Sequence, residues 1–523
     1  MEPKKLNLYS QHLIKVFEDT KLTELDKGAN VNPIVTELAS WYEKIRNVIE
    51  YREEEVILRA SIERVLKRKL ILGGNGKGVA TPLLRELIWA RYFSENSIND
   101  EVTKRVETTI DLHLKLRTHI VQTHQLKESV ATKWIYQLMS SDIENILSPS
   151  VEKETMQHFI FHILKQNIAI DDDTEETRDI QVYIAVQKAY AKNDLALLRY
   201  NLFKQFFGEL TEENFETVAA SFITCYQEIE KHLNYPLRHR IYYHTKKEIP
   251  AFLILEDILR SKKNAIKELL ENEETLNKYI LSTCQKKYNN ITGKVRRAIV
   301  RSVIFIVLSK LFFAFAIEGT YENLVYGRIM WGTISLNIII PSLLMIIAGF
   351  LIKAPGHDNT QRILKRIDTI LFKPEPQVGK RAILRLHPPS SRSALNIIFN
   401  ILWPLTFLLS FGLISLILSK LQFNIVSQGI FIFFLAIVSF LAYRINQIAH
   451  QYTVEDNQRL LTPIIDFFFM PIARVGRYLT EGIAQINIFL FILDFMIETP
   501  FKGLVAFFEQ WFLFLHAKRE DLG

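Results

Sequence analysis

The chain has 523 residues, a formal net charge of +7, 48% hydrophobic residues and 23% charged residues. This length allows two or more domains, each with its own core. Cys225 and Cys284 are the only cysteines, which excludes a disulfide framework and a cysteine zinc cluster. The first 290 residues are nearly charge-balanced, and the basic excess of the remainder lies beside apolar runs. The charge therefore indicates membrane flanks, and no nucleic-acid partner is expected.

The first 290 residues have the composition of long helices. Gly and Pro are scarce there, and apolar residues recur at spacings of three and four. The clearest pattern covers 32–72, where Asn32 and Pro33 are placed as N-cap and first-turn residue. Other helical patterns begin at Thr81-Pro82 and cover 99–145, 150–169, 178–207, 211–234 and 249–289. Because no signal peptide precedes them, the sequence predicts an all-α cytosolic multi-helix domain over residues 1–290.

Two polar stretches interrupt this helical pattern. GGNGKG at 73–78 lacks the earlier Gly and the following Ser or Thr of a phosphate-binding loop. We interpret it as a helix C-cap and turn. DDDTEETRD at 171–179 lacks the Gly and the closing Glu of an EF-hand. We expect it to be a solvated acidic loop.

Candidate chemistry in this domain is sparse. Glu154, His158 and His162 recur at steps of four, so they share one helix face as weak candidates for metal ligands. Most histidines in such patterns are surface or core residues, and the sequence shows no further ligand. The basic and aromatic stretch 232–248 is interpreted as a helix junction at Pro236, with a membrane headgroup zone as the alternative. No cofactor is expected, and no catalytic motif supports an enzyme.

Four apolar segments of the second half are long enough to cross a bilayer. They are about 298–317, 335–352, 394–418 and 425–443. Basic residues are frequent before the first span, in the loop 353–393 and after the last span, and they are rare in the other two loops. The positive-inside rule then places both termini in the cytosol, at the plasma (inner) membrane if the organism is bacterial. The basic residues expected at the membrane surface include Arg296, Arg297, Arg362, Lys365, Arg366, Lys380, Arg381 and Arg385.

Polar residues inside these spans are the strongest candidates for a site. Lys310 lies near the middle of the first span, and the others are Asn337, Asn396 and Asn400. A lysine at the bilayer centre costs about 2.5–3.5 kcal/mol on insertion scales, so Lys310 should face the bundle interior. We expect it to meet Glu318, Asn396 or Asn400, either as a structural tie between spans or as a charge beside a permeation path.

The last part of the chain, 446–523, has a different pattern. Segments 486–497 and 501–518 each combine a wide apolar face with a thin polar stripe. This pattern predicts interfacial amphipathic helices on the cytosolic side, with a re-entrant hairpin or two further spans as alternatives.

Taken together, these features predict a four-span transmembrane region over 291–445 that anchors a helical domain. The layout favours a docking or scaffold protein that binds a protein partner through residues 1–290 and anionic lipid headgroups through its basic flanks. The alternative is a transporter or channel subunit whose polar groups line a path. A membrane enzyme, with Glu154, His158 and His162 as its only candidate residues, comes third.

Overall fold

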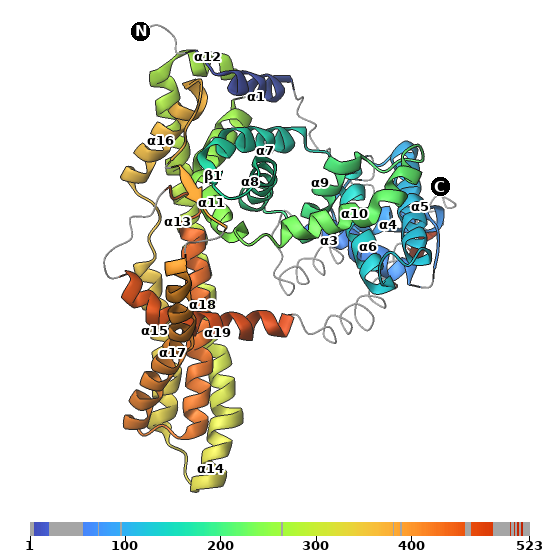
Figure 1. Cartoon of the computed structure of the whole chain (residues 1–523). Helices are drawn as coiled ribbons and strands as arrows, with labels where there is room; N and C mark the ends of the chain where they lie inside the picture. The colour runs from blue at the N-terminus through green and yellow to red at the C-terminus, as the bar shows by residue number, and fades with distance from the viewer. Residues whose placement is uncertain are drawn as a thin grey trace. The chain divides into compact units, whose positions relative to one another are not determined.

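The computed structural model describes most of the chain (Figure 1). The described residues are 5–19, 56–71, 73–94, 97–262, 265–379, 381–386, 390–454, 462–484 and single positions between 503 and 515. Helices dominate these residues, which confirms the all-α prediction. The described chain forms two compact units. We call them the helical unit (Leu8–Lys246, Lys380–Leu384, Asn487–Gly523) and the span unit (Met1–Asn7, Lys247–Gly379, Arg385–Ile486). A domain boundary at residue 290 stays a prediction.

The helical unit is a set of packed helices of moderate length. They are α1 (Leu8–Asp19), α3 (Ile57–Leu70), α4 (Gly76–Trp89), α5 (Asp100–Gln122), α6 (Glu128–Leu147), α7 (Val151–Leu164), α8 (Glu175–Ala189), α9 (Leu195–Phe207) and α10 (Phe215–Leu233), followed by α11 (Arg238–Ser261) across the unit boundary. Polar side chains cap several N-termini, for example Thr174 on α8 and Asp194 on α9. Of the helix predicted over 32–72, only the α3 part lies within the described residues.

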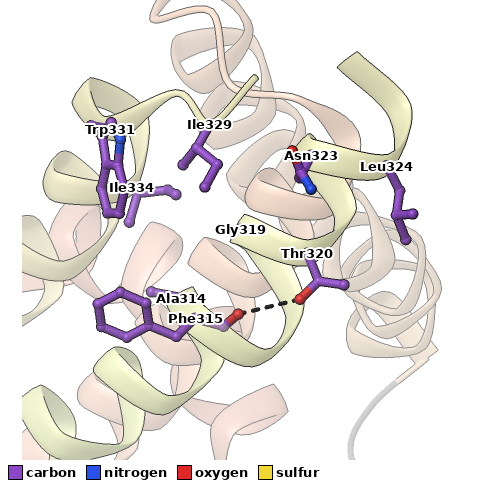
Figure 2. A pocket seen from close by; sticks show the side chains of 9 residues that line it. All are labelled: Ala314, Phe315, Gly319, Thr320, Asn323, Leu324, Ile329, Trp331 and Ile334. Atoms are coloured by element: carbon purple, nitrogen blue, oxygen red, sulfur yellow. Dashed lines mark hydrogen bonds between the residues drawn. The ribbon is translucent and has the colours of Figure 1, made fainter. Parts of the chain in front are cut away.

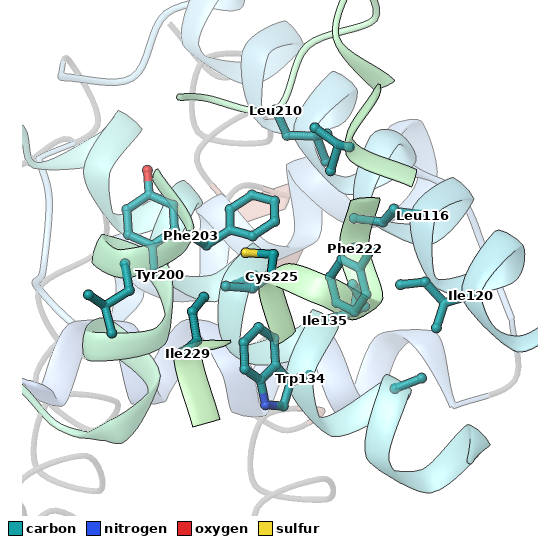
Figure 3. Close-up of a cluster of buried hydrophobic side chains, with 14 of the residues drawn as sticks. Leu116, Ile120, Trp134, Ile135, Tyr200, Phe203, Leu210, Phe222, Cys225 and Ile229 are labelled. Carbon is teal, nitrogen blue, oxygen red and sulfur yellow. The ribbon is translucent and has the colours of Figure 1, made fainter. Parts of the chain in front are cut away.

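A core of large apolar side chains joins α5, α6, α9 and α10 (Figure 3). Trp134 and Phe222 meet edge to face, with ring centroids 6.0 Å apart. Cys225 is buried in the same cluster, and burial raises the pKa of its thiol to about 12. This cysteine is therefore an inert core residue rather than a nucleophile.

The glycine-rich stretch 73–78 ends one helix and begins the next. Gly73, three residues past the end of α3, adopts a positive φ, and its N–H donates to the Leu70 carbonyl at 3.1 Å. α4 begins at Gly76 rather than at Thr81, and the Gly76 N–H donates to Asp111 Oδ1 at 2.7 Å. The chain's own carboxylate thus occupies the helix N-terminus at which a phosphate would bind. A Cβ on Gly76 would lie 2.1 Å from the Glu107 carbonyl oxygen, so this close approach of α4 to α5 requires glycine.

One short strand pair departs from the helical pattern. β1 (Ile168–Ile170) pairs in parallel with β2 (Ala382–Leu384), and Ile168 lies opposite Ala382. β1 follows α7 and the 3-10 turn η3 (Lys165–Asn167), in a segment that the sequence predicted to be helical. Three residues a strand are too few to change the fold class.

The span unit contains the membrane candidates. Its elements are α12 (Ile266–Glu271), α13 (Glu273–Phe313), the π-helix η5 (Ala314–Gly319), α14 (Thr320–Tyr326), α15 (Trp331–Leu351), α16 (His357–Phe372), α17 (Ser390–Lys420), α18 (Ile425–Ala449) and α19 (Thr462–Ala484). Four helical segments are long and apolar enough to cross a bilayer: Glu273–Tyr326, Trp331–Leu351, Ile397–Lys420 and Ile425–Ala449. They match the four predicted spans, so the chain is a helical membrane protein.

α13 is much longer than the span that it contains. Its 41 residues correspond to about 60 Å at 1.5 Å per residue. The half before the apolar segment contacts α16, whose Ile363 and Ile367 are fully buried. Asn359 of α16 donates to the Tyr288 hydroxyl at 2.8 Å and to the Tyr452 carbonyl at 2.7 Å. The apolar face of this basic amphipathic helix is therefore covered by protein.

α19 lies across the span helices at a steep angle (Figure 1) and contacts α17 and α18. A Cβ on Gly476 would lie 1.9 Å from the Ala436 carbonyl oxygen, so α19 and α18 touch backbone to backbone. Arg474 of α19 stands over the Trp403 ring at 5.3 Å. The predicted amphipathic segments 486–497 and 501–518 lie outside the described residues, apart from single positions.

Candidate functional site

The candidate site is a buried polar network between three spans. Lys310, near the end of α13, is 1% exposed, and its ammonium donates to Asn337 Oδ1 on α15. The same ammonium lies 4.5 Å from the Phe434 ring centroid on α18. A hydrogen bond and a cation–π contact together replace part of the hydration that a buried lysine loses.

Asn337 is the centre of the network, and its side chain is fully buried. While Oδ1 accepts from Lys310, Nδ2 donates to Glu318 Oε1 and, at 3.3 Å, to the Ser427 carbonyl on α18. One amide thus bridges an ammonium and a carboxylate and joins three helices. Interhelical hydrogen bonds of this kind hold membrane helices together where the hydrophobic effect does not.

The π-helix η5 turns Glu318 toward this network. Residues eight apart, such as Lys310 and Glu318, point about 80° apart on a regular α-helix. A π-turn takes up one extra residue, which brings the two side chains to within about 20° of each other. Accordingly, every fourth residue is buried through this region: Ile306, Lys310, Ala314, Glu318 and Glu322. The π-helix thus keeps Lys310, Glu318 and Glu322 on one face. In a regular α-helix of the same sequence, Glu318 and Glu322 would point away from the face that carries Lys310.

A second polar layer lies one helical turn further along the chain, in α14. Glu322 is fully buried, and its Oε2 accepts from the Met330 N–H at 2.7 Å. Its Oε1 accepts from Asn424 Nδ2 at 2.9 Å. Asn424 also caps α18 by accepting from the Ser427 N–H at 2.8 Å. This carboxylate therefore ties α14, the turn before α15 and the start of α18.

Two buried atoms of the network have no hydrogen-bond partner among the described residues. They are Glu318 Oε2 and Ser427 Oγ. A lysine amine donates hydrogen bonds and a carboxyl oxygen accepts them in both the charged and the neutral form. Asn337 can therefore accept from Lys310 and donate to Glu318 Oε1 in either form. These two hydrogen bonds thus persist whether Lys310 and Glu318 are charged or neutral.

The structure joins Lys310 directly to Asn337 and, through it, to Glu318. Of the other two predicted partners, Asn400 is exposed on α17, and the side chain of Asn396 lies outside the described residues. Polarity within apolar segments was enough to identify Asn337 as a candidate. Nothing in the sequence pointed to its pairing with Lys310, because that depends on the relative depth of the spans.

The predicted membrane-surface residues fall into two groups. Arg366 pairs with Glu248 at 3.1 Å, and Arg362 donates to the Val454 carbonyl at 3.3 Å, so both bind protein groups. Lys380 lies outside the described residues. The side chains exposed to the surroundings are Arg296, Arg297, Lys365, Arg381 and Arg385.

The structure does not join the candidate metal ligands into a site. His162 stacks on Tyr9 with ring centroids 5.3 Å apart, whereas His158 and Glu154 are exposed. Within the described ranges, no three His, Cys, Asp or Glu residues are grouped so that they could hold a metal ion. In the acidic loop, Asp173 accepts from the Tyr235 hydroxyl at 2.8 Å.

Sequence reasoning missed a charged cluster in the helical unit. Arg59 of α3 is 2% exposed and pairs with Glu63 at 2.5 Å and with Asp194, the N-cap of α9, at 2.6 Å. Its Nη1 lies 3.3 Å from Ser140 Oγ on α6. Beside it, burial raises the pKa of Glu144 to about 7. No sequence pattern indicated this cluster, because its members come from three helices far apart in the chain.

Comparisons with known proteins add no assignment to this geometry. The chain matches no protein family, no curated protein and no solved structure. The fold and the site together define a helical membrane protein with a buried ammonium–amide–carboxylate network in its spans.

Proposed function

We propose that this protein is a membrane-anchored helical docking protein with both termini in the cytosol. The observation that supports an anchor is the enclosure of the polar network. Lys310 and Glu318 are each 1% exposed and Asn337 is fully buried, so these groups bond to one another in an enclosed site instead of lining an open path. A bundle held by such a tie is suited to a fixed position.

The helical unit supplies the docking surface in this proposal. It has its own cores, and helices such as α5 and α10 present long outward faces to a partner helix. The exposed basic residues beside the spans add adhesion to anionic headgroups, about 1 kcal/mol for each one close to the surface.

The experiment compares partner capture with flux. The tagged full-length protein is crosslinked in native membranes, and co-purified proteins are quantified against an unrelated four-span protein expressed at the same level. The pure chain is also placed in liposomes that contain a pH-sensitive dye. We expect one protein partner near stoichiometric amount and no proton leak. Partner levels equal to the control, together with a leak, would rule out the docking function.

A second candidate function is proton or cation transport. The observation that favours it is Glu318 Oε2, a buried carboxyl oxygen without a hydrogen-bond partner among the described residues. Glu318→Gln tests it, because the amide keeps an acceptor for Asn337 but cannot release a proton at neutral pH. Transport requires a proton flux in the native chain that this variant loses. A fixed anchor requires no flux in either protein.

A further inference from the structure

A pocket lies at the α14 end of the span unit, between η5, α14 and the first turn of α15 (Figure 2). Its volume is about 320 Å³, at the lower end of the range for small-molecule sites. Ala314 and Gly319 of the π-helix form part of its wall. The pocket is thus built on the same π-helix as the polar network, but none of its lining residues takes part in that network.

Most of the pocket wall is apolar. Phe315 and Trp331 form one side, with ring centroids 6.5 Å apart in an edge-to-face arrangement. Leu324 on the other side is 79% exposed. The pocket lies where the first two candidate spans are joined, so we expect its apolar wall to face the border of the hydrocarbon layer.

The remaining lining residues that carry polar side chains are two hydrogen-bond donors. The Thr320 hydroxyl makes only a long bond of 3.4 Å, to the Phe315 carbonyl. The Asn323 side-chain amide, three residues on, makes no hydrogen bond to the described residues. Tyr321, Tyr326 and Trp331 surround this end in the manner of an aromatic belt, so the donors lie at the depth where lipid headgroups begin. No lining residue is charged, so the donors fit a neutral acceptor.

We propose that this pocket binds one acyl chain of a glycerolipid from the surrounding leaflet. The chain fills the apolar part between Phe315, Trp331 and Leu324. Its ester carbonyl, a neutral acceptor found at the border of the hydrocarbon, takes the hydrogen bonds of Thr320 and Asn323. This inference goes beyond the docking function and does not depend on it.

Retention of lipid tests the proposal. The full chain is reconstituted in phosphatidylcholine vesicles, extracted in mild detergent, washed stepwise and weighed by native mass spectrometry. We expect one phosphatidylcholine per chain to remain after annular lipid is removed. In Thr320→Phe the new ring fills the pocket, and the retained lipid should be lost. Ser335→Phe is the matched control, since Ser335 is an exposed residue of α15 outside the pocket, and it should keep the lipid.

A second variant removes the donors without filling the space. Thr320→Val with Asn323→Leu deletes two hydrogen bonds, so the apparent affinity should fall about tenfold, which corresponds to about 1.4 kcal/mol. This variant also decides the question if Thr320→Phe does not fold. The proposal is overturned if the native chain retains no lipid, if all variants retain it equally, or if detergent alone occupies the chain as an adventitious additive only.

Discussion

The side chain of Asn337 holds a lysine and a glutamate that would each be costly alone inside a membrane. Its amide carries an acceptor and two donors, so it can meet both charges at once. That Lys310 needs a buried polar partner followed from the sequence, because a charge in hydrocarbon must be compensated. That the direct partner is Asn337 could not be predicted, because this pairing depends on the relative depth of the first two spans in the bundle.

Removal of the Lys310 charge should destabilise the bundle. In Lys310→Leu, Glu318 loses its opposite charge and Asn337 loses its donor, which costs about 3–5 kcal/mol for a broken buried pair. Replacing the three linked residues, as in Lys310→Met, Asn337→Leu and Glu318→Met together, should restore most of that loss because no buried charge then remains without a partner. Thermal unfolding in detergent measures the stability of the single and the triple variant. A single variant as stable as the native chain would show that the network contributes nothing.

In the helical unit, the stability should depend on pH through Glu144. Its folded pKa of about 7 lies above the ordinary value of 4.5, so between these values the folded state holds a proton that the unfolded state has lost. The stabilisation is complete below pH 4.5 and is lost as the pH rises through 7. Glu144→Gln should therefore raise the melting temperature at pH 8 more than at pH 5, as measured by circular dichroism of the full chain. An equal effect at both pH values would contradict the assignment.

At the scale of elements, the four spans could be predicted and their contacts could not. Length and apolarity identify a span because a bilayer imposes both. The amphipathic pattern of α16 fitted lipid as well as protein, and only the fold shows Ile363 and Ile367 buried against protein. α19 comes closest to α18 at Gly476, and composition does not reveal this backbone contact.

The angular alignment of Lys310 and Glu318, rather than the π-turn itself, should be what the network requires. Deletion of Ala316, an exposed residue within η5, removes the extra residue and lets the segment form a regular α-helix. The two side chains are then seven residues apart and still point within about 20° of each other. We expect this variant to melt in detergent close to the native chain.

The matched variant adds one residue at the same place. Insertion of an alanine after Ala316 turns Glu318 by about 100° away from Asn337, unless the helix takes up a second extra residue. Its melting temperature should fall close to that of Lys310→Leu. If the deletion lowers the melting temperature as much as the insertion does, the π-turn has a role of its own beyond alignment.

The contact between α18 and α19 should tolerate no side chain at Gly476. In Gly476→Ala the methyl group meets the Ala436 carbonyl, a backbone atom that cannot move aside, so α19 should lift from the bundle. Gly429→Ala in α18 is the control, because a Cβ there meets nothing within 4 Å. Limited proteolysis of the chain in liposomes should cleave the first variant within α19 faster than the control. Equal cleavage rates would show that the Gly476 contact is not what holds α19 on the bundle.

For the whole molecule, the sequence predicted an all-α membrane protein, and the domain boundary at residue 290 stays a prediction. The segment from Lys247 onward groups with the spans, and Tyr288 of α13 bonds to Asn359 of α16. A fragment that ends at 290 would leave this face of α13 uncovered. The local periodicity of the sequence identifies each helix, but it does not show which distant helix packs against it. A domain boundary depends on that packing, so periodicity alone does not define it.

The orientation of the whole molecule rests on the alternation of basic residues along the spans. With both termini in the cytosol, a cysteine in place of Val325, exposed on α14, should react in intact cells with a thiol reagent that cannot cross the membrane. A cysteine in place of Asp358, exposed at the start of α16, should react only after the membrane is opened. Asp358 suits this test better than its neighbour Thr360, which is buried against the Tyr288 hydroxyl at 3.3 Å. Because Cys225 and Cys284 are both buried, the unsubstituted chain supplies the background signal. The opposite labelling pattern would place the helical unit outside the cell and would remove any cytosolic partner from the proposed function.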